Sequence, residues 1–133
     1  MAKIEKFEDI EAWKEARILC KSILLLTEKE KFSKNYSLKD QILRSSGSIM
    51  DNIAEGFDRG GKKESVQFLY ISKSSSSETK SQLYRALDFG YITQKEFESN
   101  YESCSLIAKM IMGLIKYLSK SEFKDQKSYL KEL

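Results

Sequence analysis

The sequence predicts an all-α protein of one domain, an antiparallel up-down-up-down four-helix bundle. Three observations support this prediction. Apolar residues recur every three or four positions along four long segments, which is the helical period. The chain has 133 residues and no proline, so nothing interrupts long helices from within. Short polar or glycine-containing stretches separate the segments, which favours antiparallel packing of consecutive helices.

The first helix is expected over residues 8–27. Ile10, Trp13 and Cys20 lie on one face of it, because their spacing follows the helical repeat. The polar stretch at residues 28–36 is expected to end this helix as a connection.

The second helix is expected over residues 38–57. Ser37 is the candidate N-cap, since a serine hydroxyl can accept a hydrogen bond from a free amide of the first turn. Ile42 and Ile49 mark its inner face. The glycine-containing turn at residues 59–61 is expected to stop it.

The third helix is expected over residues 62–89, with Gly90 as its stop signal. It contains a serine-rich run at residues 72–77, which is compatible with a linker or with a helix that has small inner residues. Helical spacing continues on both sides of the run, for example at Phe68 and Thr79. We therefore expect a helix that approaches its neighbour closely.

The fourth helix is expected over residues 94–119. Thr93 and Glu96 have the spacing of a capping box, in which each side chain accepts a hydrogen bond from the backbone of the other. Ile92 and Phe97 flank this pair as a hydrophobic staple.

The bundle is thus expected to occupy residues 1–119, and residues 120–133 are expected to form a polar extension that is frayed or weakly docked. The sequence contains no run of about 18 apolar residues and no apolar signal region at its start. We therefore expect a cytoplasmic protein with no membrane partner. Its two cysteines, Cys20 and Cys104, do not suggest a disulfide framework.

Enzyme chemistry finds little support in the residues. The chain has no histidine, which excludes histidine acid–base catalysis and histidine metal ligands. Residues 56–63 nearly match a phosphate-binding loop, but Lys63 stands where a hydroxyl must reach Mg²⁺, and the segment follows a helix instead of a strand. We expect no enzyme, no metal, no cofactor and no small-molecule substrate.

A structural polar network is expected between the second and third helices. Buried polar groups need partners, so such a network would fix the register of the two helices. Its predicted members are Arg44, Asn52, Glu55 and Glu78.

A second apolar stripe runs along three helices, away from the inner faces. It is compatible with a wide core-facing arc or with a subunit interface, and aligned apolar residues on several helices favour the interface. The predicted interface residues are Ile18, Leu25, Leu43, Met50, Phe57, Leu106, Met110 and Tyr117.

A basic flank is predicted on the third helix. Three lysines recur there at helical spacing with a tyrosine beyond them, and two further cations stand near its start. Such a flank can contact phosphates while the tyrosine stacks on a base; the alternative is an ordinary solvated face, since the net charge is only +3. The candidate nucleic-acid-binding residues are Arg59, Lys62, Lys63, Lys73, Lys80 and Tyr84.

Several segments carry a resemblance to a known family. They are F-E-D-I-E-A-W-K at 7–14, Q-I-L-R at 41–44, S-I-M-D-N-I-A-E-G-F at 48–57, K-K-E at 62–64, F-L-Y-I at 68–71, Ser75, Glu78, Q-L at 82–83 and G-Y-I at 90–92. In this order they resemble the bacterial four-helix-bundle proteins encoded by intervening sequences in 23S ribosomal RNA genes.

The sequence departs from the family pattern at four positions. Met50 stands where proline is frequent, and Gly61 stands where a capping serine is frequent. Leu43 and Gly60 stand where arginine is common, which lowers the basic charge available for nucleic acid.

The resemblance implies a bundle that assembles into a homo-oligomer, typically a pentameric ring, and no catalytic residue carries over. Five such chains would carry a formal charge of +15. We therefore expect a non-enzymatic binding or scaffold protein that acts on RNA or a ribonucleoprotein. The alternative is a protein–protein accessory factor, such as the related bundle that works with the reverse transcriptase of diversity-generating retroelements.

Overall fold

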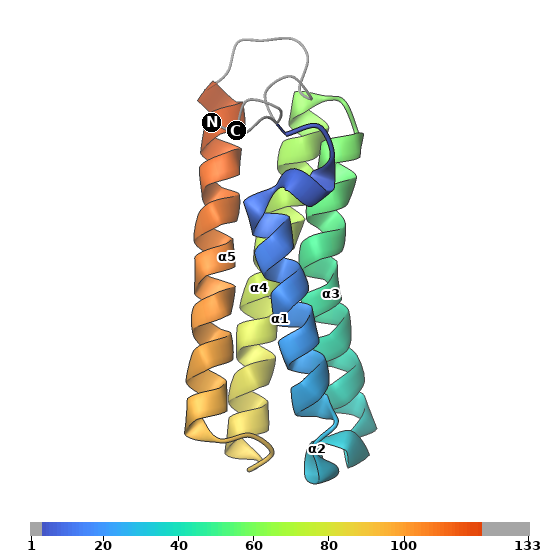
Figure 1. The fold of residues 1–133 in the computed structure, drawn as a ribbon, viewed down its shortest axis with the longest axis vertical. Helices are drawn as coiled ribbons and strands as arrows, with labels where there is room; N and C mark the ends of the chain where they lie inside the picture. The colour runs from blue at the N-terminus through green and yellow to red at the C-terminus, as the bar shows by residue number, and fades with distance from the viewer. Residues whose placement is uncertain (1–3, 121–133) are drawn as a thin grey trace.

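The computed structural model of the protein describes residues 4–120, which contain helices and no strand (Figure 1). Four helices are long and two are short. In chain order they are η1 (Phe7–Asp9, a 3₁₀ helix), α1 (Glu11–Thr27), α2 (Glu30–Lys34), α3 (Tyr36–Asp58), α4 (Lys62–Asp88) and α5 (Gln94–Lys120). The predicted all-α class is confirmed. The extension predicted for residues 120–133 lies outside the described residues, except that Lys120 ends α5.

The four long helices lie side by side, and α1 and α4 each pack against α3 and α5 (Figure 1). Polar contacts give the relative directions. Ser45 of α3 contacts Thr79 of α4, whereas Gly56 near the end of α3 contacts Ser65 near the start of α4. The two helices are therefore antiparallel.

The core runs along the whole bundle axis. Every long helix contributes aliphatic side chains that are less than 2% exposed. Among the largest are Leu19, Ile23, Leu38, Ile42, Ile49, Ile53, Leu83, Ile107, Ile111 and Ile115. The helical periodicity thus found the buried faces because one apolar stripe of each helix faces the centre.

The start of α3 differs from the prediction. The helix begins at Tyr36, and its N-cap is Asn35, whose Oδ1 accepts a hydrogen bond from the Leu38 amide at 3.0 Å. Ser37 already lies inside the helix, so its assignment as the cap was wrong. Asparagine caps as well as serine does, and it stands two residues earlier.

The connection predicted at residues 28–36 contains a helix of its own, α2. Phe32 of α2 is fully buried and stacks on Tyr91, with ring centroids 5.3 Å apart. Asn35 Nδ2 donates to the Tyr91 hydroxyl at 3.0 Å. The loop before α5 therefore holds this helix against the end of the bundle.

The serine-rich run at residues 72–77 is helical within α4, as predicted. This helix ends at Asp88, and Gly90 has a φ of +77°, a left-handed conformation that favours glycine. None of the helices between residues 4 and 120 combines the length and apolar character that a bilayer crossing requires.

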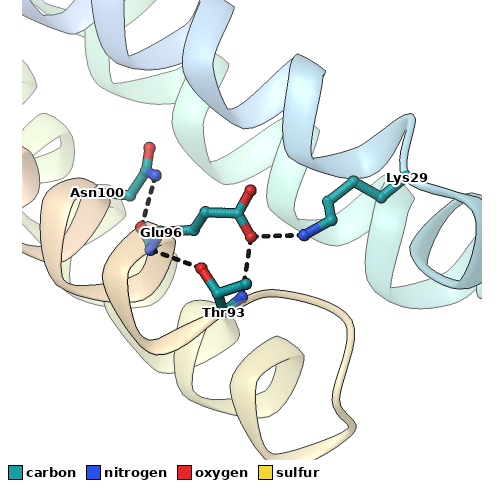
Figure 2. Close-up of polar contacts among 4 residues, drawn as sticks. All are labelled: Lys29, Thr93, Glu96 and Asn100. Carbon is teal, nitrogen blue, oxygen red and sulfur yellow. Dashed lines mark hydrogen bonds and ion pairs between the residues drawn. The ribbon is translucent and has the colours of Figure 1, made fainter.

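The predicted capping box begins α5. The Glu96 amide donates to Thr93 Oγ1 at 3.1 Å, and the Thr93 amide donates to Glu96 Oε1 at 2.8 Å (Figure 2). Ile92 and Phe97, the predicted staple pair, are both buried.

Candidate nucleic-acid interface

Buried hydroxyl groups set the position of α4 on α3. Ser45 Oγ lies 2.8 Å from Thr79 Oγ1 and 2.6 Å from Gln82 Oε1. Ser72 Oγ donates to the Ile49 carbonyl at 2.7 Å. These buried polar groups find hydrogen-bond partners in the interior, and the small serine and threonine side chains leave the two helices close together.

The predicted polar network does not form between α3 and α4 in the described part of the chain, because three of its four members pair within α3 or with its C-cap. Arg44 Nε pairs with Asp40 at 2.9 Å on the surface, and Arg59 Nε lies 3.8 Å from Glu55. Asn52 Nδ2 donates to Ser48 of its own helix. 

Glu78, the fourth predicted member, is exposed and lines a surface hollow that Arg44 also lines. Charged side chains reach water at the helix surface, whereas serine, threonine and glutamine make the buried contacts between α3 and α4.

Gly56 allows a close approach between α3 and α4. Ser65 Oγ donates to the Gly56 carbonyl, and a Cβ at Gly56 would lie 3.3 Å from both Phe68 Cβ and the Ser65 carbonyl oxygen. The contact fixes the position of the first turn of α4 along the axis of α3. It therefore places the side chains of the first turn of α4.

Two of the predicted lysines contact α5, and a third lies between them on α4. Lys62 Nζ lies 3.5 Å from the Ser119 carbonyl, and Lys80 Nζ lies 4.6 Å from the centroid of the Tyr101 ring. Lys73 falls between them at helical spacing. We call Lys62, Lys73, Lys80 and Tyr84 the α4 flank.

Tyr84 ends the α4 flank as a supported aromatic surface. It is 50% exposed, and its ring centroid lies 4.7 Å from that of Phe97 and 5.8 Å from that of Tyr101. Two rings of α5 therefore hold Tyr84 in place while half of its surface faces solvent.

Arg59 and Lys63 stand apart from the α4 flank. Arg59 is the C-cap of α3, its guanidinium lies 5.0 Å from the centroid of the Phe68 ring, and Glu55 offsets part of its charge. Lys63 is exposed in the first turn of α4.

The eight residues of the predicted apolar stripe differ in exposure: three are exposed, four are partly buried and one is buried. Ile18, Leu25 and Leu106 are exposed at 60%, 67% and 48%. Phe57 is 5% exposed and belongs to the core, so its assignment to the outer stripe was wrong. The segment that carries η1 packs against α3. The seven-residue spacing of Leu43, Met50 and Phe57 along α3 gave no sign of this contact. The remaining residues pack partly buried against the core: Leu43, Met50, Met110 and Tyr117.

Both cysteines are packed and keep their protons. Burial raises the pKa of Cys104 to about 12, and burial also raises the pKa of Cys20, whose Sγ donates to the Ser46 carbonyl at 3.3 Å. A protonated thiol is a poor nucleophile. Within residues 4–120, no three acidic or cysteine side chains gather closely enough to hold a metal ion.

The model of the family described as 23S rRNA-intervening sequence protein matches residues 8–113, a range that includes the whole α4 flank. The chain belongs to this family. No curated protein matches it. A crystal structure of a protein with unknown function from the S23 ribosomal protein family of Bacteroides thetaiotaomicron is 25% identical, with a TM-score of 0.73. The match covers 79% of this chain and 98% of that chain. Membership in the 23S rRNA-intervening sequence family thus agrees with the helical fold.

Proposed function

We propose that the protein is a non-enzymatic, homo-oligomeric scaffold of the cytoplasm that binds RNA through the α4 flank. The observation that carries the proposal is the row of three lysines that ends on a half-exposed tyrosine. The family description, which names 23S rRNA, agrees with an RNA partner.

The lysine spacing suits a phosphate backbone. Lys80 comes 18 positions after Lys62 in the same helix, which is a rise of about 27 Å at about 1.5 Å per residue. A single nucleic-acid strand that follows this line can place phosphates beside each ammonium group. Three phosphate contacts predict a slope of about −2 for the logarithm of affinity against the logarithm of salt concentration.

Assembly supports this binding mode by repeating the α4 flank. Exposed Ile18 and Leu25 lie on α1, and exposed Leu106 lies on its neighbour α5. Burying these side chains against other copies would remove apolar surface from water. We propose a homopentamer, the assembly that the family resemblance implies.

The second candidate function is a protein–protein accessory factor, such as a partner of a reverse transcriptase. The same exposed side chains of α1 favour it, because another protein can cover them as well as a second copy can. A neighbouring reverse-transcriptase gene would support this candidate, and a gene inside a 23S ribosomal RNA gene would support the first.

Charge reversal tests the α4 flank. The variant Lys62→Glu, Lys73→Glu, Lys80→Glu changes the net charge from +3 to −3. Its matched control reverses three exposed lysines on α2 and α5 by the same total charge: Lys31→Glu, Lys34→Glu, Lys95→Glu. RNA retention at low salt is measured for both variants, and thermal unfolding checks that each is folded.

The α4 flank variant should lose most of its retained RNA, whereas the control should keep most of it. Equal retention by both variants would show that the α4 flank does not bind RNA. Equal loss would show that only net charge matters.

A further inference from the structure

A second exposed tyrosine lies on the same side of α4. Tyr70 is 47% exposed, close to the 50% of Tyr84. The two are 14 residues apart, close to four turns of about 3.6 residues, so they project to the same side of the helix. Along the axis they are separated by about 21 Å.

Lysines alternate with these tyrosines. Tyr70 and Lys73 are three residues apart, and Lys80 and Tyr84 are four apart, so the members of each pair are surface neighbours. Along α4 the row therefore presents a cation, a ring, two cations and a second ring in succession: Lys62, Tyr70, Lys73, Lys80 and Tyr84.

Two of the three carboxylates of α4, Glu64 and Glu78, stand away from this row, and the third, Asp88, lies at its end. Glu64 lies against Gly61, with its Cδ 3.7 Å from the position a Cβ would take there. Glu78 lines a hollow with Gln41 of α3, on the other side of the helix. Asp88 comes one turn after Tyr84 and bounds the row at that end.

Aromatic residues of α5 support one of the two rings. Tyr84 packs against Phe97 and Tyr101, so its orientation is fixed by α5. Lys80 lies over the ring of Tyr101 and occupies one of its faces. Tyr84 and Tyr70 are therefore the rings of this row that offer large exposed surfaces.

We propose that the row binds single-stranded RNA by stacking one unpaired base on Tyr70 and another on Tyr84, while the lysines contact the phosphates between them. The inference rests on the proposed RNA-binding function and names the form of its ligand. Bases in a duplex are stacked on each other and cannot reach the tyrosines, whereas bases of a single strand can. Single-strand sites of about 4–16 nucleotides are common in folds that bind this way.

The test compares three RNA probes of about 12 nucleotides. The first is an oligoadenylate, the second is the same backbone without bases, and the third is a duplex. Fluorescence anisotropy at low salt gives the affinity of the full chain for each. The unchanged protein should bind oligoadenylate at least about fivefold tighter than the abasic strand, because each stacked base adds affinity.

The variants separate stacking from charge. Tyr84→Leu and Tyr70→Leu keep an apolar side chain but remove the ring, and each should weaken oligoadenylate binding about fivefold to 100-fold while leaving abasic binding unchanged. Tyr84→Phe and Tyr70→Phe should retain the affinity. Tyr36→Leu, which removes a ring that is 78% exposed on α3, is the matched control and should have no effect.

Two outcomes would overturn the stacking inference and leave the proposed function intact. One is equal affinity for oligoadenylate and the abasic strand, and the other is tighter binding of the duplex. If charge reversal of the three lysines also leaves all affinities unchanged, the proposed function itself fails.

Discussion

Lys29 Nζ lies 2.5 Å from Glu96 Oε1, and this ion pair joins the turn after α1 to the first turn of α5 (Figure 2). The same carboxylate oxygen accepts the Thr93 amide hydrogen at 2.8 Å. One turn later, Asn100 Nδ2 donates to the Glu96 carbonyl, and Asn100 Oδ1 accepts from Ser22 of α1. One short segment of α5 therefore both begins its helix and holds α1 in place.

Glu96 should make stability depend on pH. The hydrogen bond from Lys29, followed by the one from the Thr93 amide, holds the pKa of Glu96 below its ordinary value of 4.5. The stabilisation is therefore present above pH 4.5 and is lost as the pH falls through the lowered pKa of the folded protein. Because the side chain is 34% exposed, solvent screens part of the effect.

The variant Glu96→Gln should lose about 0.5–2 kcal/mol of unfolding free energy at neutral pH, and the loss should shrink in acid. Chemical denaturation at several pH values measures it. Glu98→Gln, on the same helix, is the control and should change little, since Glu98 accepts only from the exposed Gln94 amide among the contacts of the described chain. A loss from Glu96→Gln that is independent of pH would contradict this account.

Two glycines of α3 should respond in opposite directions to alanine. At Gly47 a Cβ meets nothing within 4 Å, so Gly47→Ala should stabilise the helix by about 0.5–1 kcal/mol. At Gly56 it would press on Phe68 Cβ and the Ser65 carbonyl at 3.3 Å, so Gly56→Ala should destabilise the bundle. Thermal unfolding of the two variants compares them directly, and equal shifts would rule out a close approach at Gly56.

The Ser45 hydroxyl should contribute measurably to the stability of the bundle. Ser45→Ala would remove the hydroxyl that donates to the buried Gln82 Oε1, at a cost of about 1–3 kcal/mol, while Thr79 keeps its hydrogen bond to the Ser75 carbonyl. The exposed Ser81→Ala on α4 is the matched control, with an expected change below about 0.5 kcal/mol. Similar unfolding midpoints for the two variants would show that the buried hydroxyl contributes nothing.

The exposed apolar side chains of α1 should control assembly. Light scattering at micromolar concentration should give the unchanged protein a multiple of its 15.4 kDa chain mass. The double variant Ile18→Glu, Leu25→Glu should reduce it to one chain, because charged groups cannot be buried there without a partner. Ile71→Glu, which alters a side chain that is 48% exposed on α4, should leave the mass unchanged. A single-chain mass for the unchanged protein would exclude the interface.

Local signals in the sequence predicted the parts of the fold that depend on local physics. The capping box of Thr93 and Glu96 needs only two residues at a fixed spacing, and it forms as expected. Helical periodicity likewise placed α4 through its serine-rich run, because a continuous apolar period outweighs the weak helix propensity of serine.

Contacts between distant segments could not be predicted in the same way. The segment of α2 contains one apolar residue, Phe32, among polar ones, so its sequence indicates a helix only weakly. Phe32 packs on Tyr91 from the loop before α5, a contact between distant segments. Phe57 followed the outer spacing of α3, yet the N-terminal segment packs against that helix. Tyr70 was not singled out, since its exposure beside the lysines appears only when the bundle determines which side of α4 faces solvent.

Crosslinking tests most directly whether α4 binds RNA. The protein and a single-stranded oligoadenylate are crosslinked with ultraviolet light, and mass spectrometry maps the modified peptides. The account predicts that most crosslinks fall on α4 between Lys62 and Tyr84, with Tyr70 and Tyr84 as the main sites, and that reversing the three lysines removes them. Crosslinks concentrated on α1 or α2, or an unchanged yield after the reversal, would contradict it.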